Sequence, residues 1–228
     1  MNETAPVSVI VPVRNAAAHL PAALASVLSQ RPAPAECIVI DGGSTDGSVA
    51  IAEAHGARIL HQEGRGLAAA RNQAIRASLH PWIAFCDGDD RWADHSLALR
   101  MQALQANPAS CAVIGRVVRE QLADTQATAA QLEQVGRPVP GFTPGALLAH
   151  RTTFDRIGFF DESLAIGTDS DWFIRLQESE QPVAQIDAVV LHKGARGTSL
   201  SSDVAAYRRE LLTVARRFIG RRRGNPTP

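Results

Sequence analysis

The sequence is short of several features that would assign a protein to a class at once. Its 228 residues include 23 Lys and Arg against 23 Asp and Glu, so the chain has no formal net charge at pH 7. General nucleic-acid-binding proteins are usually basic, so we expect no nucleic-acid partner. The chain also lacks any apolar run near the ~20 residues that span a bilayer, so we expect a cytoplasmic protein.

Cysteine is scarce as well. Cys37, Cys86 and Cys111 are odd in number, form no CxxC motif and lie in or beside apolar runs. This pattern favours buried, reduced thiols and argues against a zinc site. The N-terminal MNETAPVSVIVPV has no basic residue before its apolar stretch, so we expect a strand there and no signal peptide.

What the sequence does have is a regular alternation over its first 86 residues. Apolar, β-branched runs predict strands, and the Ala- and Leu-rich stretches between them predict helices. The strands are expected at 7–13, 36–40, 57–62 and 82–86, and the helices at 16–30, 49–55 and 67–79. This alternation is typical of βαβ units, so we predict an α/β fold with a mostly parallel sheet and helices on both faces.

The order is looser after residue 92. The elements expected there are a helix at 93–108 with Asp94 as its cap, a strand at 110–120, a helix at 169–179, a strand at 182–192 and a helix at 203–219. Residues 121–144 are polar and rich in Ala and Gln, and they predict either a helix-containing excursion or a loop.

Polar residues follow three of the predicted strands. Arg14 and Asn15 follow the first, the stretch 41–46 (DGGSTD) follows the second, and 87–90 (DGDD) follows the fourth. Ligands bind at the carboxyl ends of strands in parallel open sheets, so these groups are candidates for one site. Asp, Ser and Thr also serve as helix caps and turn residues, and for Ser44, Thr45 and Asp46 that role is an equal alternative.

The acidic stretch IAFCDGDDRW (83–92) is the most informative of the three. Capping uses at most one of Asp87, Asp89 and Asp90, whereas Mg²⁺ or Mn²⁺ commonly binds one or two carboxylates and leaves other positions to water and phosphate. Gly88 would allow a tight turn between them. Arg71, on the preceding helix, would then contact a phosphate. The alternative is a solvated acidic turn.

A second motif nearby resembles a different kind of site. Residues 64–69 (GRGLAA) match the G-x-G-x-x-A dinucleotide fingerprint, with Asp87 eighteen residues after Ala69. A nicotinamide site would require this loop to follow the first strand and to precede one ribose-binding acid. Here it follows the third strand and precedes a cluster of acids, so we set the dehydrogenase interpretation aside.

Another pair of acids opens the helix predicted at 169–179. The carboxylate of Asp169 or Asp171 would interact favourably with the helix dipole. Either one could also act as a general base that takes a proton from an attacking hydroxyl. His192 is a weaker candidate, as a third metal ligand or as an ordinary histidine. Trp92 and Trp172 flank the acidic sites and are candidates to face a sugar ring.

The last helix carries Arg208, Arg209, Arg216 and Arg217, with 221–223 (RRR) beyond them. Its apolar positions keep helical spacing, so a docked amphipathic helix is the first expectation. Peripheral contact with a membrane surface or an acidic acceptor is the alternative.

Six motifs in a fixed order resemble the family 2 glycosyltransferases of the GT-A fold, over about residues 7–200. These motifs are VSVIVPVRNAAAHLPAALASVLSQ, ECIVIDGGSTDGS, GRGLAAARNQAI, WIAFCDGDDRW, GALLAHRTTFDRIGFFDESL and DSDWFIRL. The resemblance implies an inverting transfer of a sugar from a nucleotide diphosphate sugar, with a UDP-sugar favoured, to an acceptor that it leaves unknown. It also implies Mn²⁺ or Mg²⁺.

The resemblance implies a role for each matching residue. Pro12, Arg14, Asn15, Asp41, Ser44, Arg71 and Asp87 would bind the nucleotide, Asp87 and Asp89 would form the DxD motif at the metal, and Asp169 would be the base. We expect a single domain over 1–228, with a nucleotide-binding half (1–92), an acceptor-side half (93–200) and a C-terminal basic helix and tail (201–228). Acceptor choice is expected in residues 121–144 and in the last helix.

Two positions depart from the family pattern. Thr168 stands where the family usually has Glu, and Arg196 stands in a stretch where the family often has His. A guanidinium does not ligate a metal, although it can hold a diphosphate. Thr168 keeps open the alternative of a non-catalytic protein that binds nucleotide sugars. Among enzymes, the rival is a sugar-phosphate nucleotidyltransferase, which would need a Gly-rich loop with Arg and Lys after the first strand, where this sequence has PVRNAAAHLP.

Overall fold

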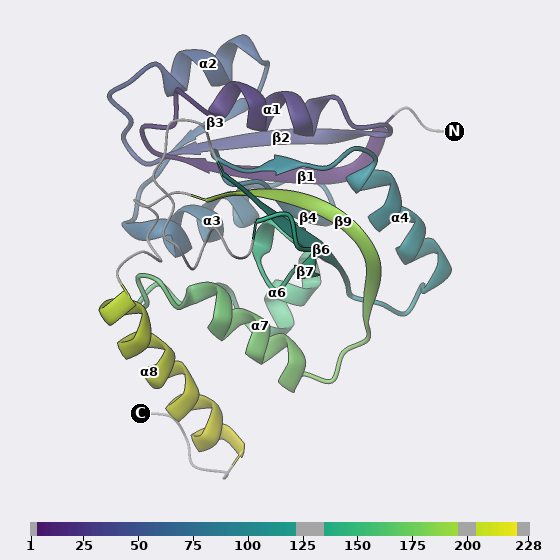
Figure 1. Cartoon of the computed structure of the whole chain (residues 1–228), viewed down its shortest axis with the longest axis vertical. Helices are drawn as coiled ribbons and strands as arrows, with labels where there is room; N and C mark the ends of the chain where they lie inside the picture. Colours follow the sequence, from purple (N-terminus) through teal and green to yellow (C-terminus); the bar gives the residue numbers. More distant parts are fainter. Residues whose placement is uncertain (1–3, 122–134, 196–203, 223–228) are drawn as a thin grey trace.

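A computed structural model describes residues 4–121, 135–195 and 204–222 (Figure 1). The first half contains β1 (Thr4–Val13), α1 (Leu20–Leu28), β2 (Ala33–Asp41), α2 (Ser48–Ala54), β3 (Arg58–His61), α3 (Gly66–Ala77) and β4 (Trp82–Phe85). The second half contains β5 (Arg91–Trp92), α4 (Ser96–Ala106), β6 (Ala112–Gln121), β7 (Val139–Pro140), the 3₁₀ turn η1 (Pro144–Ala146), β8 (Leu147–His150), α6 (Arg151–Ile157), α7 (Thr168–Glu178), β9 (Val183–Ala195) and α8 (Val204–Arg222). The alternation predicted for the first half is confirmed.

Within the described residues, one nine-stranded sheet has the order β3-β2-β1-β4-β8-β6-β9-β5, and β7 pairs with β6. The first-half strands β3, β2, β1 and β4 are all parallel, and β8 joins them to β6 through antiparallel pairs. The carboxyl ends of β1, β2 and β4 therefore meet at one edge of the sheet, as the α/β prediction requires.

The sheet is covered on both faces, which explains its continuous apolar strands. One core cluster joins the alternate residues Val9 and Val11 of β1 to Leu24 of α1 and Leu97 of α4. The other joins Ile10 to α3, α6 and α7. Cys37 and Cys86 are buried, as predicted, whereas Cys111 is only partly buried, and all three are free thiols.

Three local predictions differ from the structure. Asp94 does not cap α4, since His95 precedes the helix at φ 60° and Gln30, from the end of the α1 region, accepts the Leu97 amide hydrogen at 3.0 Å. α6 lies where no helix is predicted, because its seven residues are too short to show a clear period. β9 continues to Ala195, three residues beyond the expected end, because it pairs with β6 through that residue.

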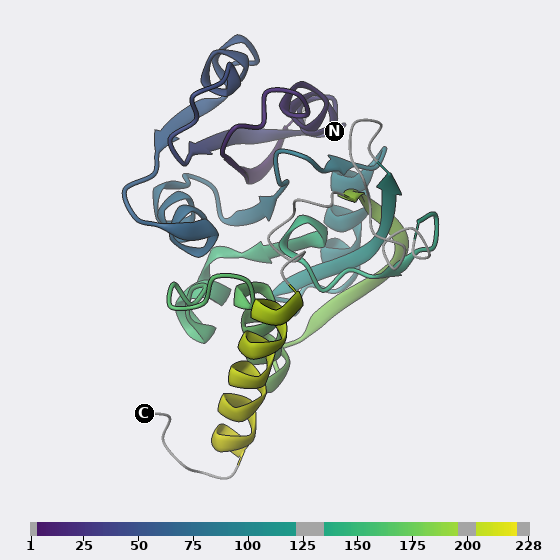
Figure 2. The ribbon, with the colours of Figure 1, turned by 60° about the vertical axis from the view of Figure 1, so that its left-hand side comes forward.

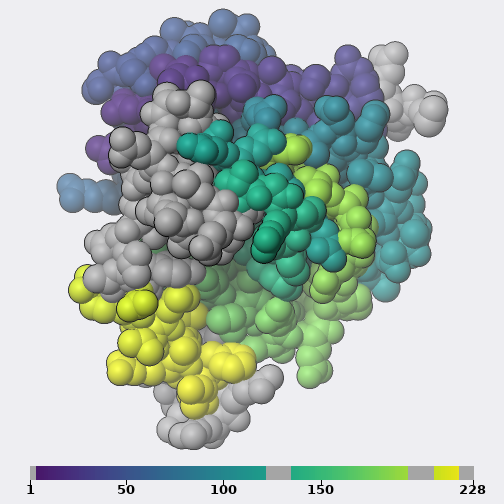
Figure 3. All heavy atoms as spheres, in the orientation of Figure 1, coloured from purple at the N-terminus to yellow at the C-terminus, as the bar shows by residue number. Residues whose placement is uncertain are grey.

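Both ribbon views show α8 running away from the sheet at the opposite end of the molecule from α1 and α2 (Figures 1 and 2). The space-filling view shows its atoms at that end as well (Figure 3). No helix among the described residues is long and apolar enough to cross a membrane. Residues 122–134, 196–203 and 223–228 lie outside the described residues, so most of the excursion predicted at 121–144, Arg196 and Arg223 lie there too.

Candidate active site

A pocket of about 1140 Å³ lies at the carboxyl ends of the first-half strands. Pro12 and Arg14 line it from the end of β1, and Asp87 and Asp89 line it from the turn after β4. Asp169 lines it from the start of α7. The topology thus brings together residues that are up to 182 positions apart in the sequence, counting from Pro12 to Gly194.

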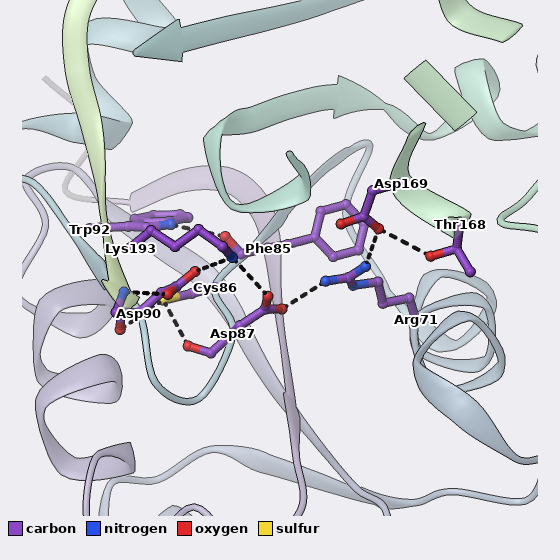
Figure 4. A network of polar contacts seen from close by, with 10 residues as sticks. Arg71, Phe85, Cys86, Asp87, Asp90, Trp92, Thr168, Asp169 and Lys193 are labelled. Atoms are coloured by element: carbon purple, nitrogen blue, oxygen red, sulfur yellow. Dashed lines mark hydrogen bonds and ion pairs between the residues drawn. The ribbon is translucent and has the colours of Figure 1, made fainter. Parts of the chain in front are cut away.

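Arg71 of α3 connects the two acidic motifs (Figure 4). Its Nη2 donates to Asp87 Oδ1 at 2.8 Å, and its Nη1 donates to Asp169 Oδ1 at 2.6 Å. The guanidinium is fully buried and lies 6.0 Å from the Phe85 ring centre and 5.6 Å from that of Phe160. One planar cation therefore fixes the separation of the two carboxylates, because its fork geometry is rigid.

The pKa values of these groups reflect the same contacts. Burial opposes ionisation of both Arg71 and Asp87, but the opposite charges and hydrogen bonds around each group outweigh it. Asp169 and Asp87 raise the pKa of Arg71, while Arg71 and Lys193 hold the pKa of Asp87 below its usual value. Arg71 and Asp87 consequently stay charged at neutral pH.

Lys193, near the end of β9, is a site residue that the sequence analysis misses. Its Nζ lies 3.2 Å from Asp90 Oδ2 and 3.7 Å from Asp87 Oδ2, and its side chain lines the pocket (Figure 4). Burial would lower the pKa of Lys193, but Asp90 and Asp87 raise it. The sequence pattern predicts that this strand ends at residue 192, so Lys193 is not among the candidates. Side chains alternate along a strand, so Lys193 faces the opposite side from His192.

Asp90, the third acid of the turn, holds β9 in place. It is almost fully buried and accepts from the Gly194 amide at 3.0 Å as well as from Lys193. Burial, with Asp87 and Asp89 close by, raises the pKa of Asp90 to about 7 although Lys193 opposes this shift. Gly88 lets the turn lie against β1, because a Cβ there would be 3.2 Å from Val13 Cγ1.

Asn15, Asp41 and Ser44, at the ends of β1 and β2, support the pocket wall and do not line it. Asp41 accepts from the amides of Gly43 and Ser44, and the Ser44 hydroxyl accepts from the Asn15 amide at 2.9 Å. Asn15 Oδ1 accepts in turn from the Thr45 amide at 2.8 Å. The pocket is lined here by Gly42 and Gly43, so Asn15, Asp41 and Ser44 hold the loop that carries those glycines.

The two candidate bases have different surroundings. Asp169 lines the pocket with its side chain 32% exposed, and Thr168 donates to its Oδ1 at 3.2 Å. Asp171 is buried and pairs with Arg175 at 2.8 Å, while the Arg175 guanidinium also donates to the carbonyls of residues 157–159. The structure therefore places Asp169 at the pocket and Asp171 in a buried ion pair of α7.

Three aromatic or histidine candidates lie elsewhere. His192 Nδ1 lies 2.6 Å from Glu120 Oε1, so the structure does not bring it to the acidic turn. The prediction that Trp92 and Trp172 face a sugar ring is wrong, since both are buried in the core. Their indole N–H groups donate to the carbonyls of Phe85 and Gly158, because large apolar rings are favoured in the core once that hydrogen bond is made.

A carboxylate of α8 holds the loop that leads into α7. Glu210 accepts from the amides of Ala165, Ile166 and Gly167 at 3.1, 2.8 and 2.8 Å. Burial opposes but does not outweigh these hydrogen bonds, which lower the pKa of Glu210. Ala165 and Ile166 line the pocket, so α8 supports the pocket wall just before Asp169.

This site and fold define an α/β protein with paired acidic motifs at a nucleotide-sized pocket. A sequence profile described as Glycosyl transferase family 2 matches residues 8–165. Since this match covers more than half of the chain, the protein belongs to glycosyl transferase family 2, and the predicted family is confirmed.

Curated relatives match a shorter part. An uncharacterized glycosyltransferase, YibD, of Escherichia coli is 38% identical over 95 residues, which are 40% of this chain and 28% of the relative. The succinoglycan biosynthesis protein ExoU of Rhizobium meliloti is 44% identical over 90 residues, 37% of this chain and 26% of the relative. The matched stretches thus span about a quarter of the length of these relatives.

Solved structures show the same fold at low identity. TarS of Staphylococcus aureus (residues 1–349, with UDP-GlcNAc) has a TM-score of 0.70 at 18% identity, over 86% of this chain and 60% of that one. A second neighbour is glucosyl-3-phosphoglycerate synthase of Mycobacterium tuberculosis, crystallised with Mn²⁺, UDP and phosphoglyceric acid. Its TM-score is 0.68 at 20% identity, over 97% of this chain and 79% of that one. The predicted GT-A fold is therefore confirmed.

Proposed function

We propose that this protein transfers a sugar from a nucleoside diphosphate sugar to an acceptor hydroxyl, with inversion at the anomeric carbon. The observation that carries the proposal is the shared contact of Arg71 with Asp87 and Asp169. Through this contact, Asp87, which suits the donor side, and Asp169, which suits the acceptor side, lie at the wall of one pocket.

Asp169 would act as the base of a single displacement. The acceptor hydroxyl gives its proton to the Asp169 carboxylate as its oxygen bonds to the anomeric carbon, and the bond from that carbon to the diphosphate breaks. The electron pair leaves with the diphosphate. Because one displacement reverses the configuration, the product would be inverted.

The leaving diphosphate carries negative charge that the pocket can offset. Arg14, Arg65, Arg119 and Lys193 line it. Lys193 and Arg71 also keep Asp87 ionised, as the lowered pKa of Asp87 indicates. These cations would hold and orient the phosphates, which is a form of electrostatic stabilisation that needs no rearrangement during the reaction.

Mn²⁺ or Mg²⁺ fits the donor atoms present. Asp87 and Asp89 offer carboxylate oxygens from one turn, and hard divalent ions bind such oxygens together with phosphate and water. No group of three His, Cys, Asp or Glu side chains suited to a metal occurs among the described residues, so phosphate and water would complete the coordination. The ion would supply positive charge to the departing diphosphate. His192 is not included, because it lies at Glu120.

A UDP-sugar is the favoured donor. Both structural neighbours described above are crystallised with a uridine nucleotide, and one of them also with Mn²⁺. Pro12, Arg14 and the loop held by Asn15, Asp41 and Ser44 would form the nucleotide side of the pocket.

The deciding experiment is calorimetric titration of the full chain with UDP, GDP and dTDP, each with and without Mn²⁺. We expect UDP to bind, and Mn²⁺ to increase its affinity. A folded sample that binds none of the three nucleotides would contradict the proposal. Binding without any sugar transfer, across a broad set of acceptors, would favour the non-catalytic alternative.

We also propose that α8 makes a peripheral membrane contact. Its exposed residues Arg208, Leu212, Arg216 and Ile219 recur at helical spacing and form one outward stripe. Leu212 and Ile219 are 58% and 47% exposed, so the stripe combines apolar and basic groups as interfacial helices do. The opposite side is fixed to the protein by Val214, Glu210 and the ion pair of Arg217 with Asp161.

A further inference from the structure

A second, smaller hollow of about 240 Å³ lies next to the pocket and is separated from it by Phe142, which lines both. We call it the amide groove. Its apolar walls come from Ile114, Phe173, Leu176 and Val183. Its polar groups are the side-chain amides of Gln177, Gln181 and Gln185.

The amide groove follows the face of α7 that begins at Asp169. Phe173 and Gln177 are four and eight residues after Asp169, so the three side chains share one side of the helix. At a rise of about 1.5 Å per residue, Gln177 lies about 12 Å from Asp169 along the helix axis. Asp169 lines the pocket and Gln177 lines the groove, so a ligand lying along this side of α7 would reach both.

The chemistry of the groove differs from that of the pocket. Among the described residues, no charged side chain lines the groove, whereas the pocket contains Asp87, Asp169 and Lys193. Each glutamine amide offers two donors and an acceptor, and the exposed Gln177 and Gln185 can pair these groups with the hydroxyls of a ligand.

Phe142 is positioned by the glycine before it. The Gly141 amide donates to the Gly115 carbonyl at 3.0 Å, and a Cβ at Gly141 would clash with that oxygen. Phe142 then meets Phe173 edge-on at 5.9 Å and remains 42% exposed. An exposed ring at the junction of two hollows offers a flat apolar surface to a ligand that passes between them.

We propose that the amide groove binds an uncharged sugar residue of an oligosaccharide acceptor, whose terminal hydroxyl lies at Asp169. The C–H faces of a sugar ring suit Phe142 and Leu176, and its hydroxyls suit the three amides. Apolar walls with a few placed polar groups are the usual composition of such sites. This inference rests on the proposed glycosyl transfer, and it names the class of acceptor.

The test is binding of the full chain to an array of neutral oligosaccharides of two to four hexose or N-acetylhexosamine residues, with uronic-acid oligomers and monosaccharides beside them. The test variant is Gln177→Ala with Gln185→Ala, since both side chains are exposed and folding should survive. The matched control is Gln102→Ala with Gln105→Ala, the same change on exposed positions of α4. Gln181→Leu is the second variant.

We expect neutral oligosaccharides to bind the unchanged and control proteins, and to bind the groove variants at least tenfold more weakly. UDP affinity should be equal in all of them. The proposal is overturned if no neutral oligosaccharide binds, if only charged ones do, or if the groove variants bind as the control does. It is also overturned if the unchanged protein is a dimer in solution and the groove variants are monomers, because the groove would then bind a second copy of the chain. Absent UDP binding would contradict the donor proposal separately.

Discussion

Single residues set the charges of the candidate site, and Arg71 is central among them. Its guanidinium is buried near two aromatic rings and contacts one carboxylate from the turn after β4 and one from α7. An unpaired buried cation would be costly, so both acids are required partners as well as candidate catalytic groups. A substitution of either acid can therefore change both the transfer rate and the free energy of unfolding, and the two need to be measured separately.

Asp169→Asn should stop sugar transfer while UDP still binds. The amide keeps the shape and one oxygen for Arg71, but it does not accept the proton of the acceptor. General-base catalysis contributes about 10²–10⁴-fold, so we expect a loss of that size in kcat. Steady-state transfer assays together with UDP titration check this. If transfer continued at the normal rate, Asp169 would not be the base.

Asp171→Asn provides the comparison, because it lies two residues away on the same helix. It weakens the buried pair with Arg175, so we expect a stability loss of about 2–3 kcal/mol and a melting temperature lower by about 5–10 °C. Transfer at a temperature where the variant is folded should be nearly unchanged. Thermal unfolding and the same transfer assay measure both effects, and a kinetic loss without a stability loss would exchange the two roles.

Asp89→Asn should remove the effect of Mn²⁺ on UDP affinity. Asp89 lines the pocket in the turn beside Asp87, and an amide is a weaker ligand than a carboxylate for a hard cation. Titration with UDP at several Mn²⁺ concentrations measures the change. Affinity that still rises with Mn²⁺ as in the unchanged protein would place the ion elsewhere.

At the scale of elements, the candidate base depends on a helix far along the chain. Glu210 of α8 binds three successive amides just before α7, and Arg217 of α8 pairs with Asp161. The start of α7 is thus held from two sides, by Arg71 within the site and by α8 outside it. An exposed helix that docks in this way affects the site without contacting a substrate.

Glu210→Gln should therefore lower kcat several-fold and leave UDP binding largely intact. It should also lower the free energy of unfolding by about 1 kcal/mol at pH 7, a modest value because the carboxylate is partly exposed. The pKa of Glu210 is lowered in the folded state, so its contribution is present above the unfolded pKa of about 4.3 and disappears as pH falls through the folded value. Denaturant unfolding of both proteins from pH 7 to pH 3 should show the difference vanish, and a constant difference would contradict this account.

At the scale of the whole molecule, the zero formal net charge hides an uneven distribution. α8 presents exposed basic and apolar groups at the end of the molecule opposite α1 and α2 (Figures 1 and 3). An anionic bilayer attracts each nearby basic residue by about 1 kcal/mol, and the exposed Leu212 and Ile219 add apolar contact. The direction of α8 would place such a bilayer away from the sheet.

Arg208→Glu with Arg209→Glu and Arg216→Glu should weaken binding to vesicles that contain anionic lipid by about a hundredfold or more. The control is Arg31→Glu with Arg137→Glu and Arg156→Glu, which makes the same charge change at exposed positions outside α8. Vesicle sedimentation at two salt concentrations measures both. Equal loss in the two variants would mean that net charge, and not α8, governs binding.

The α/β alternation is predictable from local sequence patterns, since continuous β-branched runs need two covered faces. Asp87 and Asp89 are predictable as well, because they follow a strand at the edge of the sheet where ligands bind. The family, and with it the preference for Asp169, is predicted by the resemblance of six motifs. Chain order could not show that α7 turns Asp169 toward the pocket and Asp171 into the core. It also could not show that Trp92 and Trp172 are buried, because flanking an acid in sequence does not fix the face of a side chain.

The contacts that cross long stretches of chain become visible only in the folded molecule. Lys193 reaches Asp87 and Asp90 because β9 pairs with β6 to Ala195, and Glu210 reaches residues 165–167 because α8 docks beside α7. The amide groove exists because β6, β9, α7 and the segment at Phe142 meet at one place. Packing selects such contacts from many that the local sequence permits, since burial and charge pairing depend on the whole arrangement and local propensity does not.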